Sequence, residues 1–156
     1  MSVVPGNKGK SGIVIGMLFV VVSPLVAYHE GVVPHTYADV NGTATLCAGE
    51  TGPGIEWGMK TTMADCLTRL DKRLALEWSR VEPCIQRPIT RNQAAALLSW
   101  SYNVGAPAAC GSSLMRKLNA GQPFCADLSK WTYSQGRQLK GLVKRRADER
   151  KLCETP

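Results

Sequence analysis

Residues 30–51 read EGVVPHTYADVNGTATLCAGET, and the rest of the chain is organised around this segment. It places two carboxylic acids, Glu30 and Asp39, before an Asn-Gly pair, and Thr45 after it. Glycoside hydrolysis needs two carboxyl groups in different environments, because one donates a proton to the leaving oxygen while the other stays ionised beside the developing positive charge. A nearby hydroxyl can hold the attacking water. The spacing alone also fits two solvated loop charges. The surrounding sequence has to decide between these charges and a catalytic pair.

The segment 36–51 is rich in β-branched residues and contains Asn41-Gly42, which together predict a β-hairpin. A strict two-residue turn at this point pairs Asp39 with Ala44 and sends Asp39 and Thr45 to opposite faces. Both residues can serve one site only if the loop is longer than two residues or carries a bulge.

The chain beyond residue 60 is predicted to be helical. Residues 62–65 (TMAD) resemble a capping box, and apolar residues recur at helical spacing from there until Pro83 ends the helix. A second capping box at 90–93 (TRNQ) opens a helix that ends near Gly105. Shorter helices are expected at about 112–119 and 123–132, and a basic one at about 139–152. The predicted fold class is therefore α+β, with a small hairpin lobe, a helical bundle and a cleft between them.

The basic C-terminal helix has an expected buried face and an expected solvated face. Its apolar side chains, Leu139, Leu142 and Val143, are predicted to face the core. Its charged side chains are predicted to face solvent: Lys144, Arg145, Arg146 and Arg150.

The N-terminal sequence is typical of an exported protein. Residues 1–11 are polar and include Lys8 and Lys10, and an uncharged run follows over residues 12–28. This run is at the short end for a membrane-spanning helix, with its lysines on the cytoplasmic side. A cleaved signal peptide, a permanent anchor and a releasable anchor are the alternatives. Cleavage after Ala27 is disfavoured, because it puts Leu25 where a small residue is preferred and leaves Glu30 without a helix to hold it.

Six cysteines, an even number without a Cys-x-x-Cys pair, predict three disulfides in an oxidising compartment. Short spans between predicted helices favour Cys125 with Cys153 and Cys84 with Cys110, which leaves Cys47 with Cys66. The two histidines do not have the spacing of a zinc site. The net charge of +7 suits an anionic partner such as nucleic acid, anionic lipid or an acidic cell wall, but no nucleic-acid-binding motif accompanies it.

The ordered set of motifs resembles that of a known family. Glu-Gly at 30–31, Tyr-x-Asp at 37–39, Gly-x-x-Thr at 42–45 and Cys-x-Gly at 47–49 resemble the active-site signature of phage-type lysozymes, glycoside hydrolase family 24. The resemblance covers roughly residues 28–153 and includes SYNVG at 101–105, SLMRKLNAG at 113–121, KWTY at 130–133 and GLVKRR at 141–146. One departure is Glu50, where family members commonly have His.

The resemblance implies a lysozyme-like, two-lobed muramidase that needs no metal or cofactor. Glu30 would be the general acid, with its pKa raised by partial burial between the N-terminal helix and the hairpin. Asp39 would stabilise the cationic transition state or act as base, and Thr45 would position the water. By the same resemblance, three residues would contact sugar: Tyr102, Asn103 and Ser113.

The resemblance extends to the signal-anchor-release endolysins of phages. It implies that residues 1–28 form a releasable anchor before a muramidase domain at 29–156. The host Sec pathway would export the chain, residues 12–28 would tether it to the inner membrane, and the released enzyme would act on peptidoglycan in the periplasm, as a monomer. Two alternatives remain: a wall-binding protein that has lost activity, for which Glu50 is the best support, and a lytic transglycosylase.

Overall fold

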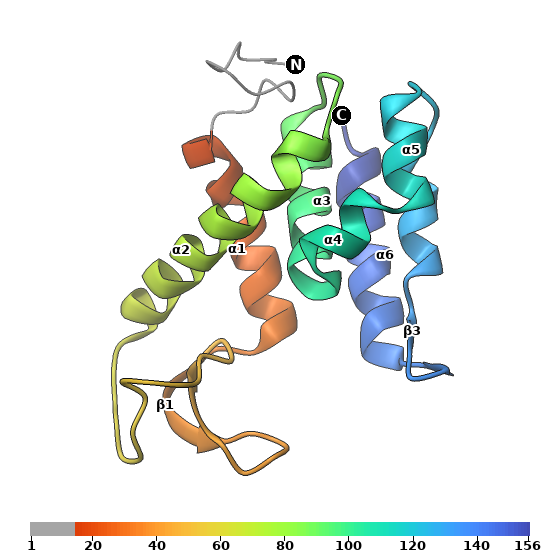
Figure 1. The fold of residues 1–156 in the computed structure, drawn as a ribbon. Helices are drawn as coiled ribbons and strands as arrows, with labels where there is room; N and C mark the ends of the chain where they lie inside the picture. The colour runs from red at the N-terminus through yellow and green to blue at the C-terminus, as the bar shows by residue number, and fades with distance from the viewer. Residues whose placement is uncertain (1–14) are drawn as a thin grey trace. The chain divides into compact units, whose positions relative to one another are not determined.

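The computed structural model describes residues 15–156, and the chain divides into two compact units (Figure 1). We call Ser23–Arg73 the hairpin unit. The helical unit comprises Leu74–Pro156 together with the described residues up to Val22. The first half of the predicted anchor segment, residues 1–14, lies outside the described residues.

Helix α1 (Ile15–Glu30) contains most of the uncharged N-terminal run. Leu18, Val22 and Val26 are fully buried, and their spacing of four residues places them on one side of the helix. The helix ends where Gly31 adopts φ +71° and its N–H donates to the carbonyl of Ala27 at 3.1 Å. Within residues 15–156, no helix combines the length and the apolar character needed to cross a membrane.

The hairpin unit is built on strands β1 (Val33–Ala38) and β2 (Ala44–Cys47), which pair antiparallel with an irregularity near the start of β1. The chain then returns along the other edge of β1, where His35 forms an isolated bridge with Lys60. It enters helix α2 (Met63–Val81), whose N-terminal part belongs to this unit. A small core joins these parts and consists of Val32, Leu46, Cys47, Ile55, Met59 and Cys66.

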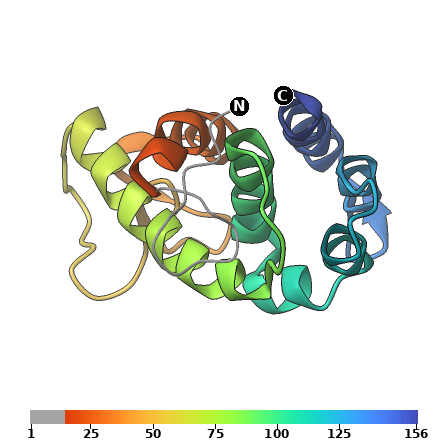
Figure 2. The same ribbon diagram turned by 90° about the horizontal axis from the view of Figure 1, so that it is seen from above.

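The helical unit is centred on α3 (Arg91–Val104), which begins with the predicted capping box of Thr90 and Gln93 and is buried from Ala94 to Ser101. The other elements that lie wholly in this unit are η1 (Glu82–Cys84), α4 (Ala106–Cys110), α5 (Ser113–Asn119), η2 (Cys125–Lys130), β3 (Tyr133–Ser134), β4 (Arg137–Gln138) and α6 (Lys140–Glu154). Helix α6 packs against α3 and against η2 (Figure 1, Figure 2). The predicted α+β class is confirmed.

Three disulfides confirm the predicted pairings. Cys47–Cys66 lies in the hairpin unit, where it joins the end of β2 to α2. Cys84–Cys110 and Cys125–Cys153 lie in the helical unit and link η1 to α4 and η2 to α6. No cysteine remains free among the described residues, which include all six.

The prediction for the faces of α6 is right for Lys144, which is exposed, but wrong at four other positions. Arg145 and Arg146 are buried, whereas Leu139 and Val143 are exposed. The two arginines can be buried because Glu149, which is 0% exposed, pairs with both: the Arg145 Nε lies 3.2 Å from Oε1 and the Arg146 Nε 2.6 Å from Oε2. Buried charges persist where they are paired with one another.

Candidate active site in the hairpin unit

Glu30 is the last residue of α1, and the hairpin begins three residues later at Val33. It is exposed, so the predicted partial burial of this side chain is wrong. The position explains the exposure, because the helix ends here and the chain turns away at Gly31. The fold therefore fixes the backbone of Glu30 at the junction between α1 and the hairpin.

Asp39 and Thr45 meet the geometric condition that the sequence imposed on a shared site. Tyr37 lies opposite Thr45 and Ala38 opposite Ala44, and the Asp39 N–H donates to the carbonyl of Thr43 at 3.0 Å. The loop thus contains three residues, 40–42, rather than two. Because side chains alternate along a strand, Asp39 falls on the same face as Tyr37 and hence as Thr45.

The Asp39 carboxylate is fixed by the turn that follows it. Its Oδ1 accepts hydrogen bonds from the backbone N–H groups of Asn41 and Thr43, each at 2.8 Å. The Gly42 N–H in turn donates to the Asp39 carbonyl at 2.9 Å, with Gly42 at φ +75°. A side-chain oxygen that caps its own turn in this way is restrained in position and orientation.

Thr45 is held in place on β2. It is 2% exposed, and its hydroxyl donates to the carbonyl of Thr43 at 3.0 Å. A hydroxyl that donates one hydrogen bond keeps two lone pairs as acceptors. The oxygen of Thr45 can therefore accept a hydrogen bond from a water molecule while its own orientation stays fixed.

The three predicted sugar-binding residues belong to the helical unit. Tyr102 and Asn103 lie in the last turn of α3, where Tyr102 is half-buried and Asn103 exposed. Ser113 is exposed and is the first residue of α5.

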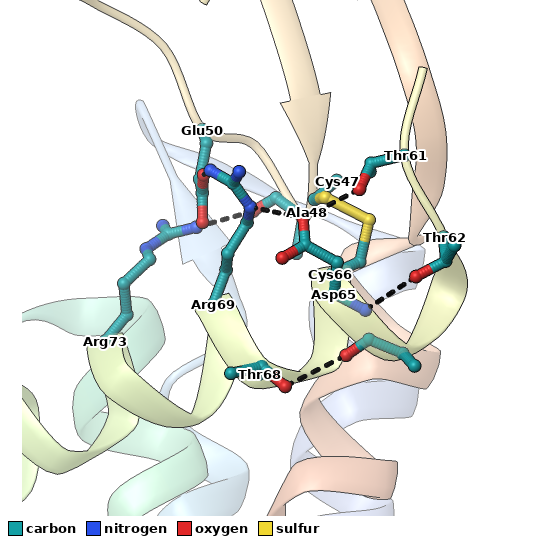
Figure 3. Close-up of a disulfide and its surroundings, with 11 residues drawn as sticks. Cys47, Ala48, Glu50, Thr61, Thr62, Asp65, Cys66, Thr68, Arg69 and Arg73 are labelled. Carbon is teal, nitrogen blue, oxygen red and sulfur yellow. Dashed lines mark hydrogen bonds and ion pairs between the residues drawn. A yellow bond between two sulfur atoms is a disulfide. The ribbon is translucent and has the colours of Figure 1, made fainter. Parts of the chain in front are cut away.

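Glu50, Asp65 and Arg69 form a charged cluster that the sequence did not predict (Figure 3). Arg69 on α2 bonds Glu50 through Nη1 at 3.2 Å and Asp65 through Nε at 2.7 Å. These contacts lower the pKa of the Asp65 carboxyl, chiefly through the Arg69 hydrogen bond and then that of Thr61, and raise the pKa of Arg69. The only sequence signal was the departure at Glu50.

The cluster lines a pocket of about 760 Å³ in the hairpin unit. Its wall includes Glu50, Asp65 and Arg69 but none of Glu30, Asp39 and Thr45. Within residues 15–156, no group of three or more His, Cys, Asp or Glu side chains could hold a metal ion.

Comparisons with known proteins agree on one family. The family model described as phage lysozyme matches residues 27–149. The chain is 41% identical over 126 residues to the SAR-endolysin of Enterobacteria phage P21, which covers 80% of this chain and 76% of that protein. It is 34% identical over 122 residues to the SAR-endolysin of Escherichia phage Mu, with coverages of 77% and 71%. The muramidase domain of SpmX from Asticaccaulis excentricus is structurally similar, with a TM-score of 0.76, 27% identity, and coverage of 86% of this chain and 95% of that one.

Proposed function

The chain belongs to the phage lysozyme family, and we propose that it cuts the β-1,4 bond between N-acetylmuramic acid and N-acetylglucosamine in peptidoglycan. Family membership makes it a glycoside hydrolase, an endolysin that degrades peptidoglycan to lyse the host. One observation supports the assignment of the bond-cutting residues: Asp39 and Thr45 share one face of the hairpin, which begins three residues after Glu30.

The three residues divide the chemistry among them. Glu30 donates a proton to the glycosidic oxygen as the bond to the leaving sugar breaks. Asp39, held by two backbone N–H groups, stays beside the positive charge that develops on the sugar ring or accepts a proton from water. Thr45 accepts a hydrogen bond from that water. Because Glu30 is exposed in the protein, the bound glycan itself has to exclude water from its carboxyl group.

Sugar contacts in the helical unit are part of the same proposal. Asn103 and Ser113 expose a side-chain amide and a hydroxyl, and Tyr102 is half-buried. These are groups that bind sugar hydroxyls through neutral hydrogen bonds. The overall positive charge favours encounter with the anionic wall.

The experiment that tests this proposal is hydrolysis of purified peptidoglycan by Glu30→Gln, which removes only the transferable proton. The rate should fall by about two to four orders of magnitude while the unfolding midpoint stays the same. Glu56→Gln is the matched control, because Glu56 is an exposed glutamate of the same unit and the change of charge is identical. A Glu30→Gln rate within threefold of wild type would contradict the assignment.

Product analysis separates the alternatives. A hydrolase leaves a reducing end, a lytic transglycosylase leaves an anhydro sugar, and a wall-binding protein leaves the glycan intact. Point variants serve better here than a chain without residues 1–27, because Leu18, Val22 and Val26 are fully buried in the folded protein.

The cellular route is also a proposal. Host Sec export would insert residues 12–28 in the inner membrane, and release would free a monomeric enzyme in the periplasm. Residues 1–28 would act as the anchor and 29–156 as the muramidase domain. The buried side of α1, formed by Leu18, Val22 and Val26, supports a releasable anchor. These apolar side chains can face lipid before release and the interior of the protein afterwards.

A further inference from the structure

The turn formed by residues 47–50 is bonded to α2 at every residue except Gly49 (Figure 3). The disulfide with Cys66 holds Cys47, the Arg73 guanidinium donates to the Ala48 carbonyl at 3.0 Å, and Arg69 holds Glu50. Gly49 closes the turn with φ +87°. Three different kinds of bond thus fix three of the four residues 47–50 against one helix.

Besides Cys47, which is itself the last residue of β2, Glu50 also connects this attachment to β2. Its backbone forms two reciprocal hydrogen bonds with Leu46, each at 2.9 Å. Leu46 is fully buried and directly follows Thr45. Moving Glu50 therefore moves the backbone of Leu46, and with it the backbone of Thr45.

The backbone of this turn needs external restraint. Cys47 adopts φ +56°, the left-handed region that residues with a Cβ occupy at a cost. Such a conformation persists when neighbouring contacts over-determine it. The disulfide of Cys47 and the ion pair of Glu50 supply contacts on both sides of the turn.

Arg69 is a rigid partner for Glu50. Its Nε is held by Asp65 Oδ2 at 2.7 Å, and the same oxygen accepts the Thr61 hydroxyl at 2.7 Å. The Glu50 side chain is only 17% exposed, so this pair is better shielded from solvent than an ordinary surface ion pair. A carboxylate at position 50 is thus matched to the cation on α2.

We propose that Glu50 is a positioning residue for catalysis: by pairing with Arg69 it fixes the turn and sets the place of the Thr45 hydroxyl that holds the attacking water. The inference depends on the role proposed above for Thr45. A misplacement of a catalytic group by about 1 Å can cost about 100-fold in rate. The loss should therefore appear in kcat and not in KM, because Thr45 orients water rather than glycan.

The test compares Glu50→Ala with Glu56→Ala on a soluble glycan, with rates normalised to folded protein and measured well below both unfolding midpoints. Glu50→Ala should lower kcat about 10- to 100-fold with KM within twofold. Glu56→Ala should leave both constants unchanged. Glu50→Gln keeps an acceptor oxygen for Arg69, so it should recover part of the lost kcat, and it replaces Glu50→Ala if that variant does not fold.

A double-mutant cycle with Thr45→Ala shows whether Glu50 acts through Thr45. If it does, the double variant should be no slower than Thr45→Ala alone. Losses that multiply, or an unchanged kcat for Glu50→Ala when Thr45→Ala is slow, would overturn this inference and leave the proposed site intact. An unchanged rate for Thr45→Ala would overturn the proposed water-holding role, and this inference with it.

Discussion

Asp39 and Thr45 lie on the same face of the β1–β2 hairpin. Thr45 pairs with Tyr37 on the neighbouring strand, and Asp39 is two residues beyond Tyr37. The three-residue loop produces this arrangement, because an odd number of loop residues aligns Asp39 with Thr43. A two-residue turn would shift the alternation by one and turn Asp39 away. The relative placement of these two proposed site residues is thus determined by the length of the loop.

Deleting Asn41 should abolish activity through this change of register. The shortened loop either sends Asp39 to the opposite face or forces β2 to slip, which would expose the buried Leu46. We expect a loss of about 100-fold or more in peptidoglycan hydrolysis. Inserting two residues after Asn41 is the control, because it preserves the alternation and should retain more activity than the deletion. A deletion variant with a third of wild-type activity would contradict this account.

Asp39→Asn and Asp39→Ala should separate charge from turn stability. Asn keeps an oxygen that can accept from the N–H groups of Asn41 and Thr43, whereas Ala removes both hydrogen bonds. Asn should therefore lose activity with little loss of stability. Ala should lose activity and also about 1–3 kcal/mol of stability, at roughly 0.5–1.5 kcal/mol per bond. Hydrolysis rates and urea unfolding measure the two effects, and equal stability of the variants would be inconsistent with the turn contacts.

The turn illustrates where sequence reasoning reached its limit. Asn41-Gly42 predicted a hairpin at the right place, but its favoured two-residue turn was not adopted. The side chain of Asp39 competes for the same backbone N–H groups and stabilises a wider loop. Signals that depend only on residues close in sequence were reliable: the capping box of Thr90 and Gln93 begins α3 as predicted.

Other features depended on tertiary context. The second hairpin, β3–β4, turns at Gln135-Gly136 with φ +49° and +76°, and Gln is a poor signal for that conformation. The predicted helix at 123–132 is a shorter 3-10 segment, Cys125–Lys130. On α6 the apolar residues suggested the wrong buried face, because burial of Arg145 and Arg146 depends on Glu149, which periodicity cannot reveal.

Glu149→Gln should be among the most destabilising conservative substitutions. Glu149 accepts from the Ser99 hydroxyl at 2.7 Å and pairs with Arg145 and Arg146, all of them buried. Burial raises the pKa of Glu149, and the nearby Arg146 opposes that shift. Gln removes the charge with which Glu149 pairs to both buried arginines, and breaking a buried pair costs about 3–5 kcal/mol.

The control for this substitution lies on the same helix. Glu154→Gln breaks a single ion pair with Arg150 at 2.8 Å, in which both side chains are more than 40% exposed. An exposed pair is worth about 0–1 kcal/mol. Urea unfolding should therefore rank Glu149→Gln well below Glu154→Gln, and similar stabilities would contradict the buried role of Glu149.

Acid should destabilise the charged cluster around Asp65. Its folded pKa is lowered, first by the hydrogen bond from Arg69, so the unfolded chain takes up the proton at a higher pH than the folded chain. The ionised Asp65 carboxylate therefore stabilises the folded protein above the pKa of Asp in the unfolded chain, about 3.9. This contribution to the free energy of unfolding is lost as pH falls through the lower pKa of the folded state. Asp127, with its pKa lowered by Lys117, acts in the same direction. Asp65→Asn should reduce the fall in unfolding temperature between pH 5 and pH 3, and an unchanged fall would contradict this prediction.

Gly16→Leu should separate membrane release from enzyme activity. Gly16 is exposed on α1, and a Cβ added there would meet nothing within 4 Å, so the folded enzyme should tolerate Leu and keep its rate on purified peptidoglycan. In the bilayer, Leu makes the run 12–28 more apolar and should retain the anchor for longer. We therefore expect delayed lysis in cells, more strongly with Gly12→Leu added. The double variant should also fail to respond when the membrane potential is collapsed.

Gly16→Ala is the control, since it gives a similar gain in helix propensity with little added apolar surface. Normal lysis by a Gly16→Leu protein that is still in the membrane fraction would show that release is not the switch, and an N-terminus at Tyr28 in active protein would identify an ordinary cleaved signal peptide.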